Sequence, residues 1–254
     1  MMNPPTIGLV VPCYREQESI AELLQQVRVA LPEVRIVVVD DSPDLLTVKA
    51  VEELALDGVR MIHRDAKEGR GSAVLLGMKE LLSQGCLRII EMDADFSHPP
   101  SQVAELEQGL RGRGLDLLIA SRYLPQSSIE NWPWTRLLFS RFANLVARAL
   151  LGVPITDYTN GFRAYSREAA ECVTATCGRM GKGFIPLSET LLNLHNRGYR
   201  IGETPTIFVN RLRGESSVNT EELWNAASGV LRIFLRLRMK ALFFPPKNHR
   251  SNRR

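Results

Sequence analysis

The chain has 254 residues, of which 44% are hydrophobic and 24% charged, and this balance excludes a disordered or fibrous protein. The formal net charge is only +4, but cationic residues crowd the C-terminal end and favour an anionic surface as partner: Arg232, Arg236, Arg238, Lys240, Lys247, Arg250, Arg253 and Arg254. The four cysteines form no CxxC pair, which indicates a reduced, cytoplasmic setting.

The first half of the chain alternates short apolar runs with segments that have the apolar spacing of helices. The runs are too continuous in apolar character for one solvated face, so we predict buried strands at Ile7 to Val11, Arg35 to Val39, Arg60 to His63, Leu87 to Met92 and Asp116 to Ala120. This alternation predicts an α/β fold, with a Rossmann-like, mostly parallel sheet and helices on both faces.

Polar residues gather directly after four of the predicted strands. The stretches read PCYRE, DDSPD, DADFSH and SRY. In an open parallel sheet, ligands bind outside the carboxyl ends of the strands, where such loops meet. The sequence therefore predicts one site built from four loops.

Beyond Tyr123 the pattern changes to loops, basic helices and short strands. We expect first a loop-like stretch at 124–134, then a basic amphipathic helix at 135–152 and turn signals at 157–166 before another helix. A glycine-spaced loop at 177–184 and a helix at about 186–196 follow. Short strands are expected around 200–204 and 206–212, and a basic helix at about 221–242. We expect neither a signal peptide nor a transmembrane helix, because the apolar segments are too short or are interrupted by cations.

Asp93 and Asp95 stand one residue apart where the fourth predicted strand ends. Residues i and i+2 of an extended segment point to the same side, so both carboxylates can face one divalent cation. Oxygen ligands favour Mg²⁺ or Mn²⁺ over zinc. The alternative for an isolated pair of this kind is a turn or a helix cap, and the position in a four-loop cluster favours the metal.

Several motifs occur together in a characteristic order. They read V-P-x-Y-x-E, V-D-D-S-P-D, E-G-x-G-S-A, M-D-A-D-F-S-H-P-P, S-R-Y, E-N-W-P, D-Y-T-N-G-F-R and R-L-R-G-E-S. From Ile7 to Ser216 the chain resembles the family-2 inverting glycosyltransferases of the GT-A fold. Within that family it is most similar to the dolichyl- or polyprenyl-phosphate mannosyltransferases.

The resemblance implies a metal-dependent transfer of a hexose, in the first place mannose from GDP-mannose, to a polyprenyl or dolichyl phosphate. A UDP-sugar donor or another acceptor is the alternative. It implies that residues 1–128 form the nucleotide-sugar-binding half of one GT-A domain, that 129–216 form its acceptor-side half, and that 217–254 add a basic helix and tail. No nucleic acid partner is expected.

The resemblance also implies a role for individual residues. The nucleoside of the donor would be held by Pro12, Tyr14, Glu16, Val39 and Asp41. The metal and the diphosphate would be held by Asp93, Ala94 and Asp95. Ser97 stands where the family usually has a glutamine that approaches the metal. Serine is shorter, so a water between Ser97 and the metal is favoured over direct ligation. Phosphate groups would be bound by Arg122, Arg136 and Arg211, whose planar guanidinium groups suit phosphate oxygens.

The chain departs from the family pattern in two further places. Ser217 stands where the family commonly has a lysine near the phosphates, and DDSPD is one residue shorter than the usual motif. Because a cation is lost at residue 217, two alternatives to full activity stay open. One is a changed donor preference, and the other is a transferase that binds nucleotide without turnover.

The chemistry that these residues permit needs no strong base. The leaving diphosphate gathers negative charge, which a metal held by Asp93 and Asp95, together with Arg211, would stabilise. A lipid monophosphate with a second pKa near ~6 is already largely ionised at neutral pH and can attack directly. We therefore expect His98 to orient its loop rather than to titrate, and Asp157 to belong to the acceptor site.

The basic C-terminal helix carries Arg232, Arg236 and Lys240 along one stripe beside apolar residues. Such a helix can lie at a membrane interface near anionic lipid. We expect peripheral attachment to the cytosolic face of a membrane, with a membrane subunit as a further candidate partner. Packing of the helix on the domain or on a second subunit is the alternative.

Two rival functions stay open at this point. Asp93-Ala-Asp95 also resembles the D-x-D loop of haloacid dehalogenase-type phosphatases, although that motif normally follows the first strand. The basic C-terminus also suits a non-enzymatic module that binds membranes or nucleic acid, but this would leave most of the motifs unexplained.

Overall fold

The computed structural model describes residues 7–178 and 185–210. Arg211, Ser217, the predicted basic C-terminal helix and most of the predicted loop at 177–184 lie outside these residues. Within the described ranges, no helix has the length and apolar character needed to cross a bilayer.

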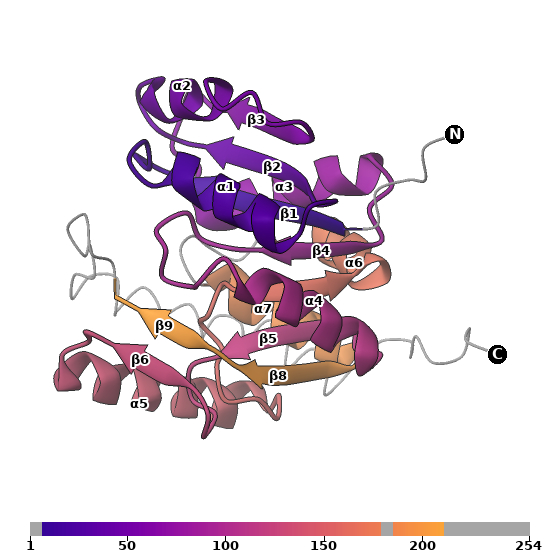
Figure 1. Ribbon diagram of the computed structural model, residues 1–254. Coiled ribbons are helices and arrows are strands. Elements are labelled where there is room, and N and C mark those ends of the chain that lie inside the picture. The colour runs from indigo at the N-terminus through magenta and orange to yellow at the C-terminus, as the bar shows by residue number, and fades with distance from the viewer. Residues whose placement is uncertain (1–6, 179–184, 211–254) are drawn as a thin grey trace.

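A seven-stranded sheet forms the centre of the molecule (Figure 1). Its strand order is β3-β2-β1-β4-β7-β5-β8, and every strand runs in one direction except β7, which is antiparallel to both of its neighbours. The strands are β1 Ile7–Cys13, β2 Arg35–Asp40, β3 Val59–His63, β4 Arg88–Glu91, β5 Leu117–Ser121, β7 Arg163–Ser166 and β8 Ile201–Pro205. The predicted mostly parallel sheet and its predicted strands are confirmed.

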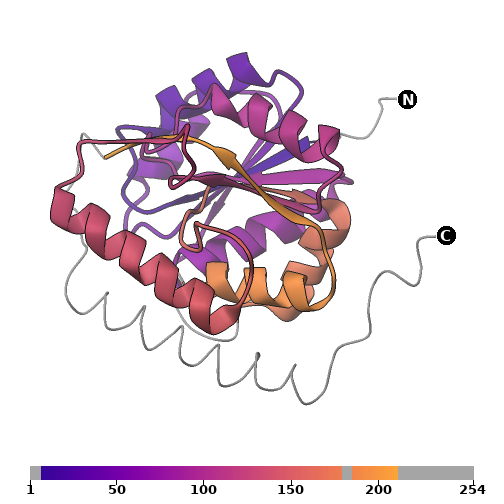
Figure 2. The same cartoon turned by 90° about the horizontal axis from the view of Figure 1, so that it is seen from below.

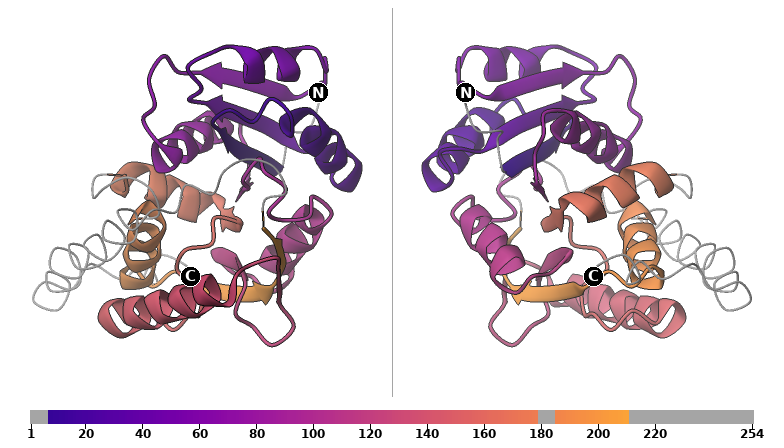
Figure 3. Two further views of the ribbon diagram at one scale, coloured as in Figure 1. Left: turned by 90° about the vertical axis from the view of Figure 1, so that its left-hand side faces the viewer. Right: turned by 90° about the vertical axis from the view of Figure 1, so that its right-hand side faces the viewer.

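Helices cover both faces of this sheet, as predicted, and each face has its own apolar core. One face is covered by α1 Ile20–Ala30, α2 Leu46–Glu52 and α4 Gln102–Gly112. The other face is covered by α3 Arg70–Ser83, α5 Trp134–Leu151, α6 Arg167–Thr176 and α7 Ile185–Asn196. Figures 2 and 3 show the two helical layers on either side of the strands.

The alternation of side chains along the strands explains the two layers. In β1, Leu9 and Val11 pack with the first set of helices, whereas Val10 packs with the second. Successive side chains of a strand point to opposite faces, so a strand with helices on both sides must be apolar at every position. This requirement produces the continuous apolar runs that made these strands predictable.

Strand β7 was not predicted, because the sequence of residues 157–166 indicated only turns before a helix. The strand is four residues long and holds Arg163, which is fully buried. Its guanidinium donates to the backbone carbonyls of Tyr158, Asn160 and Leu187, at 2.9, 2.7 and 3.0 Å. A buried cation satisfied in this way interrupts the apolar pattern on which a strand prediction depends.

The stretch predicted as a loop at 124–134 also contains a short strand. Strand β6, Ser128–Glu130, pairs in parallel with β9, Ile207–Val209, as a small second sheet. Strand β9 lies within the strand expected around 206–212, whereas the three residues of β6 are too few for a periodicity to be recognised. This pair brings residues near 130 beside residues near 208, which are far apart in the sequence.

Helix α3 approaches β1 closely at Gly77. A Cβ atom at this residue would lie 2.3 Å from Val10 Cγ2. We therefore expect Gly77→Ala to lower the free energy of unfolding by about 1–3 kcal/mol, because the packed core cannot admit an additional methyl group. Urea denaturation followed by circular dichroism measures this change.

Gly112→Ala is the matched control, because a Cβ atom at this end of α4 would meet nothing within 4 Å. We expect its unfolding midpoint to equal or slightly exceed that of the wild type. Equal midpoints for the Gly77 and Gly112 variants would contradict the close approach of α3 to β1.

Candidate active site

The four predicted loops meet at one edge of the sheet. Strands β1, β2, β4 and β5 run in the same direction, so their carboxyl ends share that edge. The first two loops contact each other directly, because the backbone N–H of Arg15 donates to Ser42 Oγ at 2.7 Å. The predicted convergence of the loops is confirmed.

Asp93 and Asp95 lie in the segment that leaves β4. Both are partly exposed, whereas Met92 and Ala94 are buried. The backbone then turns sharply, since Phe96 has a φ of 58° and the N–H of Ser97 donates to Asp95 Oδ1 at 3.0 Å. Asp93 and Asp95 are thus partly exposed carboxylates separated by a buried residue, and Asp95 also accepts the hydrogen bond that closes the turn at Ser97.

The donor set suits a hard divalent cation, because carboxylate oxygens are the ligands that Mg²⁺ and Mn²⁺ prefer. Within residues 7–178 and 185–210, no group of three or more His, Cys, Asp or Glu side chains could hold a metal ion. A cation held by Asp93 and Asp95 would take further ligands from a bound diphosphate or from water. Ser97 is buried, and its backbone carbonyl accepts from Val209 N–H at 2.9 Å, so both backbone groups of Ser97 shape the loop.

Arginine side chains that the sequence did not single out contact two of the candidate carboxylates. Arg70 Nε lies 2.7 Å from Asp93 Oδ1. Arg64 binds both oxygens of Asp41, at 2.6 and 2.7 Å. Arg70 lies within the E-G-x-G-S-A motif, and Arg64 lies four residues before it.

Asp41 is buried and also accepts the backbone N–H groups of Glu68 and Gly69, at 3.1 and 2.9 Å. Its carboxylate therefore fixes the segment from Arg64 to Gly69 against the end of β2. The sequence assigned Asp41 to the donor nucleoside, and the structure shows that protein groups already bind both of its oxygens.

The other predicted nucleoside residues divide into buried and accessible ones. Pro12 and Val39 are register partners in β1 and β2, and both are buried. Tyr14 is 37% exposed, and its ring faces Lys67 Nζ at 3.6 Å from the ring centroid. Glu16 is partly exposed and accepts the Ser19 hydroxyl at 3.0 Å. Tyr14 and Glu16 are the side chains of this set that can reach a ligand.

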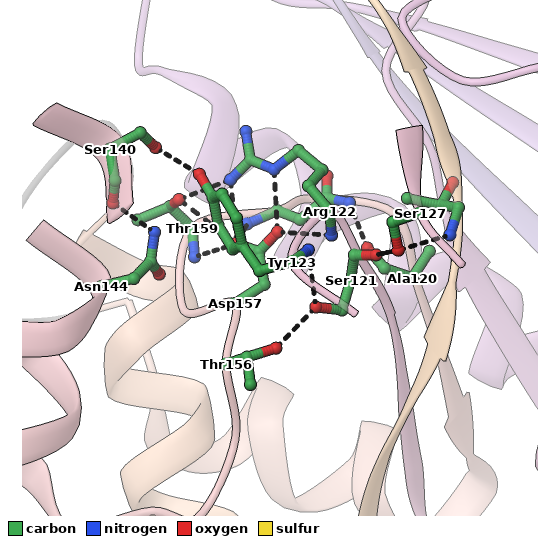
Figure 4. A network of polar contacts seen from close by, with 12 residues as sticks. Ala120, Ser121, Arg122, Tyr123, Ser127, Ser140, Asn144, Thr156, Asp157 and Thr159 are labelled. Carbon is green, nitrogen blue, oxygen red and sulfur yellow. Dashed lines mark hydrogen bonds and ion pairs between the residues drawn. The ribbon is translucent and has the colours of Figure 1, made fainter. Parts of the chain in front are cut away.

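A buried ion pair joins the loop after β5 to the segment before β7 (Figure 4). Arg122 Nε and Nη2 donate to the two oxygens of Asp157, each at 2.8 Å, and Nη2 also donates to Thr159 Oγ1 at 2.7 Å. Burial alone would raise the pKa of Asp157, but the Arg122 guanidinium and several hydrogen bonds outweigh it and hold the pKa below its ordinary value. Asp157 is therefore a carboxylate that positions Arg122 and not a proton acceptor.

The structure brings Arg122 and Arg136 together on the indole ring of Trp132. The guanidinium carbons lie 5.4 and 4.4 Å from the ring centroid, within the range of cation–π contacts. Arg136 Nη1 also donates to Asn210 Oδ1 at 3.1 Å. The third predicted phosphate-binding arginine, Arg211, follows Asn210 and lies outside the described residues.

Comparison with known proteins agrees with this geometry. The model of the family described as Glycosyl transferase family 2 matches residues 9–174. The chain belongs to this family. It is therefore an enzyme, a glycosyltransferase, and the phosphatase and non-enzymatic interpretations are set aside.

Curated relatives of this glycosyltransferase match along most of its length. A polyprenol monophosphomannose synthase of Mycolicibacterium smegmatis is 36% identical over 91% of this chain and 88% of the relative. An undecaprenyl-phosphate mannosyltransferase of Micrococcus luteus is 35% identical over 92% and 96%. A dolichol-phosphate mannosyltransferase of Pyrococcus furiosus is 33% identical over 89% of this chain and 63% of the relative.

Solved structures confirm the fold. Glucosyl-3-phosphoglycerate synthase of Mycobacterium tuberculosis, crystallised with Mn²⁺, UDP and phosphoglyceric acid, superposes with a TM-score of 0.65 at 19% identity, covering 91% of this chain and 77% of that one. The predicted GT-A fold of this glycosyltransferase is thus confirmed.

His98 connects the loop after β4, which holds Asp93 and Asp95, to two other segments. Its Nε2 lies 2.9 Å from Asn160 Oδ1, and its Nδ1 lies 3.2 Å from Thr206 Oγ1. Burial lowers the pKa of His98 to about 4, although the nearby Asp93 carboxylate opposes this shift. The imidazole is neutral at neutral pH, as expected of a residue that orients its loop.

The lowered pKa of His98 makes stability depend on pH. The unfolded chain binds a proton near the ordinary value of 6.5, whereas the folded chain binds it only near 4. The contribution of neutral His98 to the free energy of unfolding is therefore fully present above pH 6.5. It is lost as the pH falls towards 4, and the total loss is about 3 kcal/mol. We expect His98→Gln to be less stable than wild type at neutral pH but to lose less stability on acidification.

Thermal unfolding measured between neutral and acidic pH tests this expectation. Val29→Ser, at an 83% exposed position of α1, is the control, because it changes no titratable group and should keep the wild-type dependence on pH. The same pH dependence in the His98 variant and the wild type would contradict the role assigned to the buried imidazole.

Proposed function

We propose that this glycosyltransferase moves mannose from GDP-mannose to a polyprenyl or dolichyl phosphate, with inversion at the anomeric carbon and with Mg²⁺ or Mn²⁺ bound at Asp93 and Asp95. The observation that carries the proposal is that the loop after β4, which holds Asp93 and Asp95, lies beside Arg122 and Arg136 on Trp132. The Phe208 ring contacts both the His98 ring and the Trp132 ring, at centroid distances of 5.1 and 5.2 Å. The names of the three curated relatives support mannosyl transfer and a polyprenyl-type acceptor.

The residues suit a direct displacement between two phosphate-bearing substrates. Arg136 would bind and orient the acceptor phosphate, together with Arg122 and, on sequence grounds, Arg211. A phosphate oxygen attacks the anomeric carbon while the bond to the donor diphosphate breaks. A bound divalent metal supplies positive charge for the leaving diphosphate.

A carboxylate base is unnecessary for this reaction, because the acceptor phosphate is largely ionised at neutral pH with a second pKa near ~6. Asp157 could not serve as a base in any case, since Arg122 and backbone N–H groups bind its oxygens and lower its pKa. Its role in the proposed reaction is to keep the Arg122 guanidinium in place.

A donor panel tests the proposal, with GDP-mannose and UDP-glucose each offered with a short polyprenyl phosphate and Mn²⁺ or Mg²⁺. We expect metal-dependent mannolipid from GDP-mannose. We also expect Asp95→Asn to weaken metal-dependent donor binding roughly 100-fold in calorimetry, because the negative charge that attracts the cation is lost and only a neutral amide oxygen remains. Asp57→Asn is the control, since Asp57 is exposed at the opposite edge of the sheet, before β3.

Glycolipid from UDP-glucose but not from GDP-mannose would replace the proposed donor. Absence of product with every donor, alongside measurable nucleotide binding, would show a transferase that has lost turnover. Unchanged donor affinity in Asp95→Asn with metal present would remove Asp95 from the site.

We further propose peripheral attachment to the cytosolic face of a membrane through α5. Four large apolar side chains project from this helix at spacings of three or four residues, with exposed fractions of 75, 62, 62 and 63%: Trp134, Leu138, Phe142 and Leu145. Arg141 and Arg148 are exposed on the same helix. An exposed apolar stripe flanked by cations suits the interface of an anionic bilayer, where the acceptor's lipid chain would lie.

Flotation with vesicles that contain anionic lipid tests this attachment. We expect the Leu138→Ser/Phe142→Ser double variant to lose membrane affinity by about tenfold or more, because two large apolar side chains no longer enter the bilayer. Val29→Ser is the matched control, since Val29 is an 83% exposed residue of α1. Equal flotation of all three proteins, or none with the wild type, would contradict attachment through α5.

A further inference from the structure

Arg70 contacts the first carboxylate of the metal motif and two further groups. Arg70 is the first residue of α3, and its side chain is 19% exposed. Its Nε lies 2.7 Å from Asp93 Oδ1, its Nη1 lies 3.5 Å from Glu91 Oε1, and its Nη2 donates to the carbonyl of Gly161 at 3.2 Å. The guanidinium thus joins α3, the end of β4 and the segment before β7.

The backbone at Gly161 leaves room for this guanidinium. A Cβ atom at residue 161 would lie 1.9 Å from Arg70 Nη2 and 2.6 Å from its Cζ. Gly161 is not among the glycines with positive φ, so an L-residue could adopt its backbone conformation. A side chain at residue 161 would therefore displace the Arg70 guanidinium from the space that it now fills.

Glu91 keeps Arg70 in this position. Glu91 is buried, accepts the Tyr165 hydroxyl at 3.1 Å, and has a pKa raised by burial, an effect that Arg70 opposes. Burial disfavours the charged form of Arg70, but Asp93 and Glu91 outweigh this and raise its pKa above the ordinary value. The guanidinium is therefore a permanent positive charge directly beside a proposed metal ligand.

We propose that Arg70 makes metal binding at Asp93 depend on a bound nucleoside diphosphate. This inference rests on the metal and diphosphate site of the proposed function. Without the diphosphate, Arg70 neutralises part of the charge of the two aspartates and repels a divalent cation. With the diphosphate bound, the same guanidinium attracts its phosphate oxygens. The metal therefore enters together with the nucleotide rather than before it.

A purely structural role for Arg70 predicts the opposite sign. If Arg70 only held Asp93 in place, its loss would disorder the ligand and weaken Mn²⁺ binding in every condition. If its charge controls the site, its loss strengthens the binding of Mn²⁺ alone and weakens the binding of the diphosphate. The direction of the change in Mn²⁺ affinity thus separates the two roles.

The experiment measures free Mn²⁺ by electron paramagnetic resonance with the full chain, without nucleotide and with GDP or UDP. We expect Arg70→Gln to bind Mn²⁺ alone about tenfold tighter than wild type and to show a smaller gain in Mn²⁺ affinity on adding either nucleotide. Arg70→Lys keeps the charge and should bind Mn²⁺ alone nearly as wild type does.

Two further variants support the comparison. Gly161→Ala leaves the charge in the chain but forces the guanidinium away, so we expect it to shift Mn²⁺ affinity in the same direction as Arg70→Gln. It also keeps the test decisive if Arg70→Gln fails to fold. Arg60→Gln is the control, because Arg60 forms an ion pair with Glu80 near the amino end of β3 and should not alter Mn²⁺ binding.

Unchanged or weaker binding of Mn²⁺ alone in both Arg70→Gln and Gly161→Ala would overturn the inference. A wild-type chain that binds Mn²⁺ equally well with and without nucleotide would overturn it as well. Nucleotide-dependent Mn²⁺ binding that is lost in Arg70→Gln, in a protein that transfers no mannose, would support the role of Arg70 and count against the proposed function alone.

Discussion

The buried guanidinium of Arg163 fixes the turn on which the polar groups of the site depend. It donates to the carbonyls of Tyr158 and Asn160 at one end of β7 and to that of Leu187 at the start of α7. The same turn supplies a partner to each of three loops: Asp157 to Arg122, Asn160 to His98, and the Gly161 carbonyl to Arg70. Burying the Arg163 guanidinium without these carbonyls would lower the stability of the fold by on the order of 3–5 kcal/mol. The strand that buries Arg163 and the turn that supplies the carbonyls must therefore form together.

Paired charges hold the loops around this turn. Asp41 pairs with Arg64, Asp93 with Arg70 and Asp157 with Arg122, and each pair joins two different segments. Partly or fully buried ion pairs of this kind add little net stability, because desolvation offsets most of the attraction. Their effect is on geometry, since each bidentate or multiply bonded arginine restricts its carboxylate to one orientation. For a transferase that must align two phosphates, such prior ordering lowers the entropic cost of reaction.

Part of this architecture could be predicted from the sequence. The strands buried on both faces were recognisable because Leu9, Val10 and Val11, for example, are all apolar, which no half-exposed strand requires. The loops at the sheet edge followed from the strands. Strand β7 was not recognisable, because Arg163 occupies a position where the pattern demands an apolar residue. Arg64 and Arg70 were not singled out, because a lone arginine in the sequence is more often an exposed cation than the partner of a particular carboxylate.

The α/β class, the family and the closely spaced pair Asp93 and Asp95 could be recognised without any structure, because strand alternation and motif order are properties of near neighbours in the chain. Which cation meets which carboxylate follows only from the way the chain is folded. Arg64 lies 23 residues from Asp41, Arg70 lies 23 residues from Asp93, and Arg122 lies 35 residues from Asp157. Such pairs depend on the order of strands in the sheet and on the insertion of β7 between β4 and β5. The pattern of neighbouring residues does not encode the strand order, because the packing of the whole sheet settles which strands lie side by side.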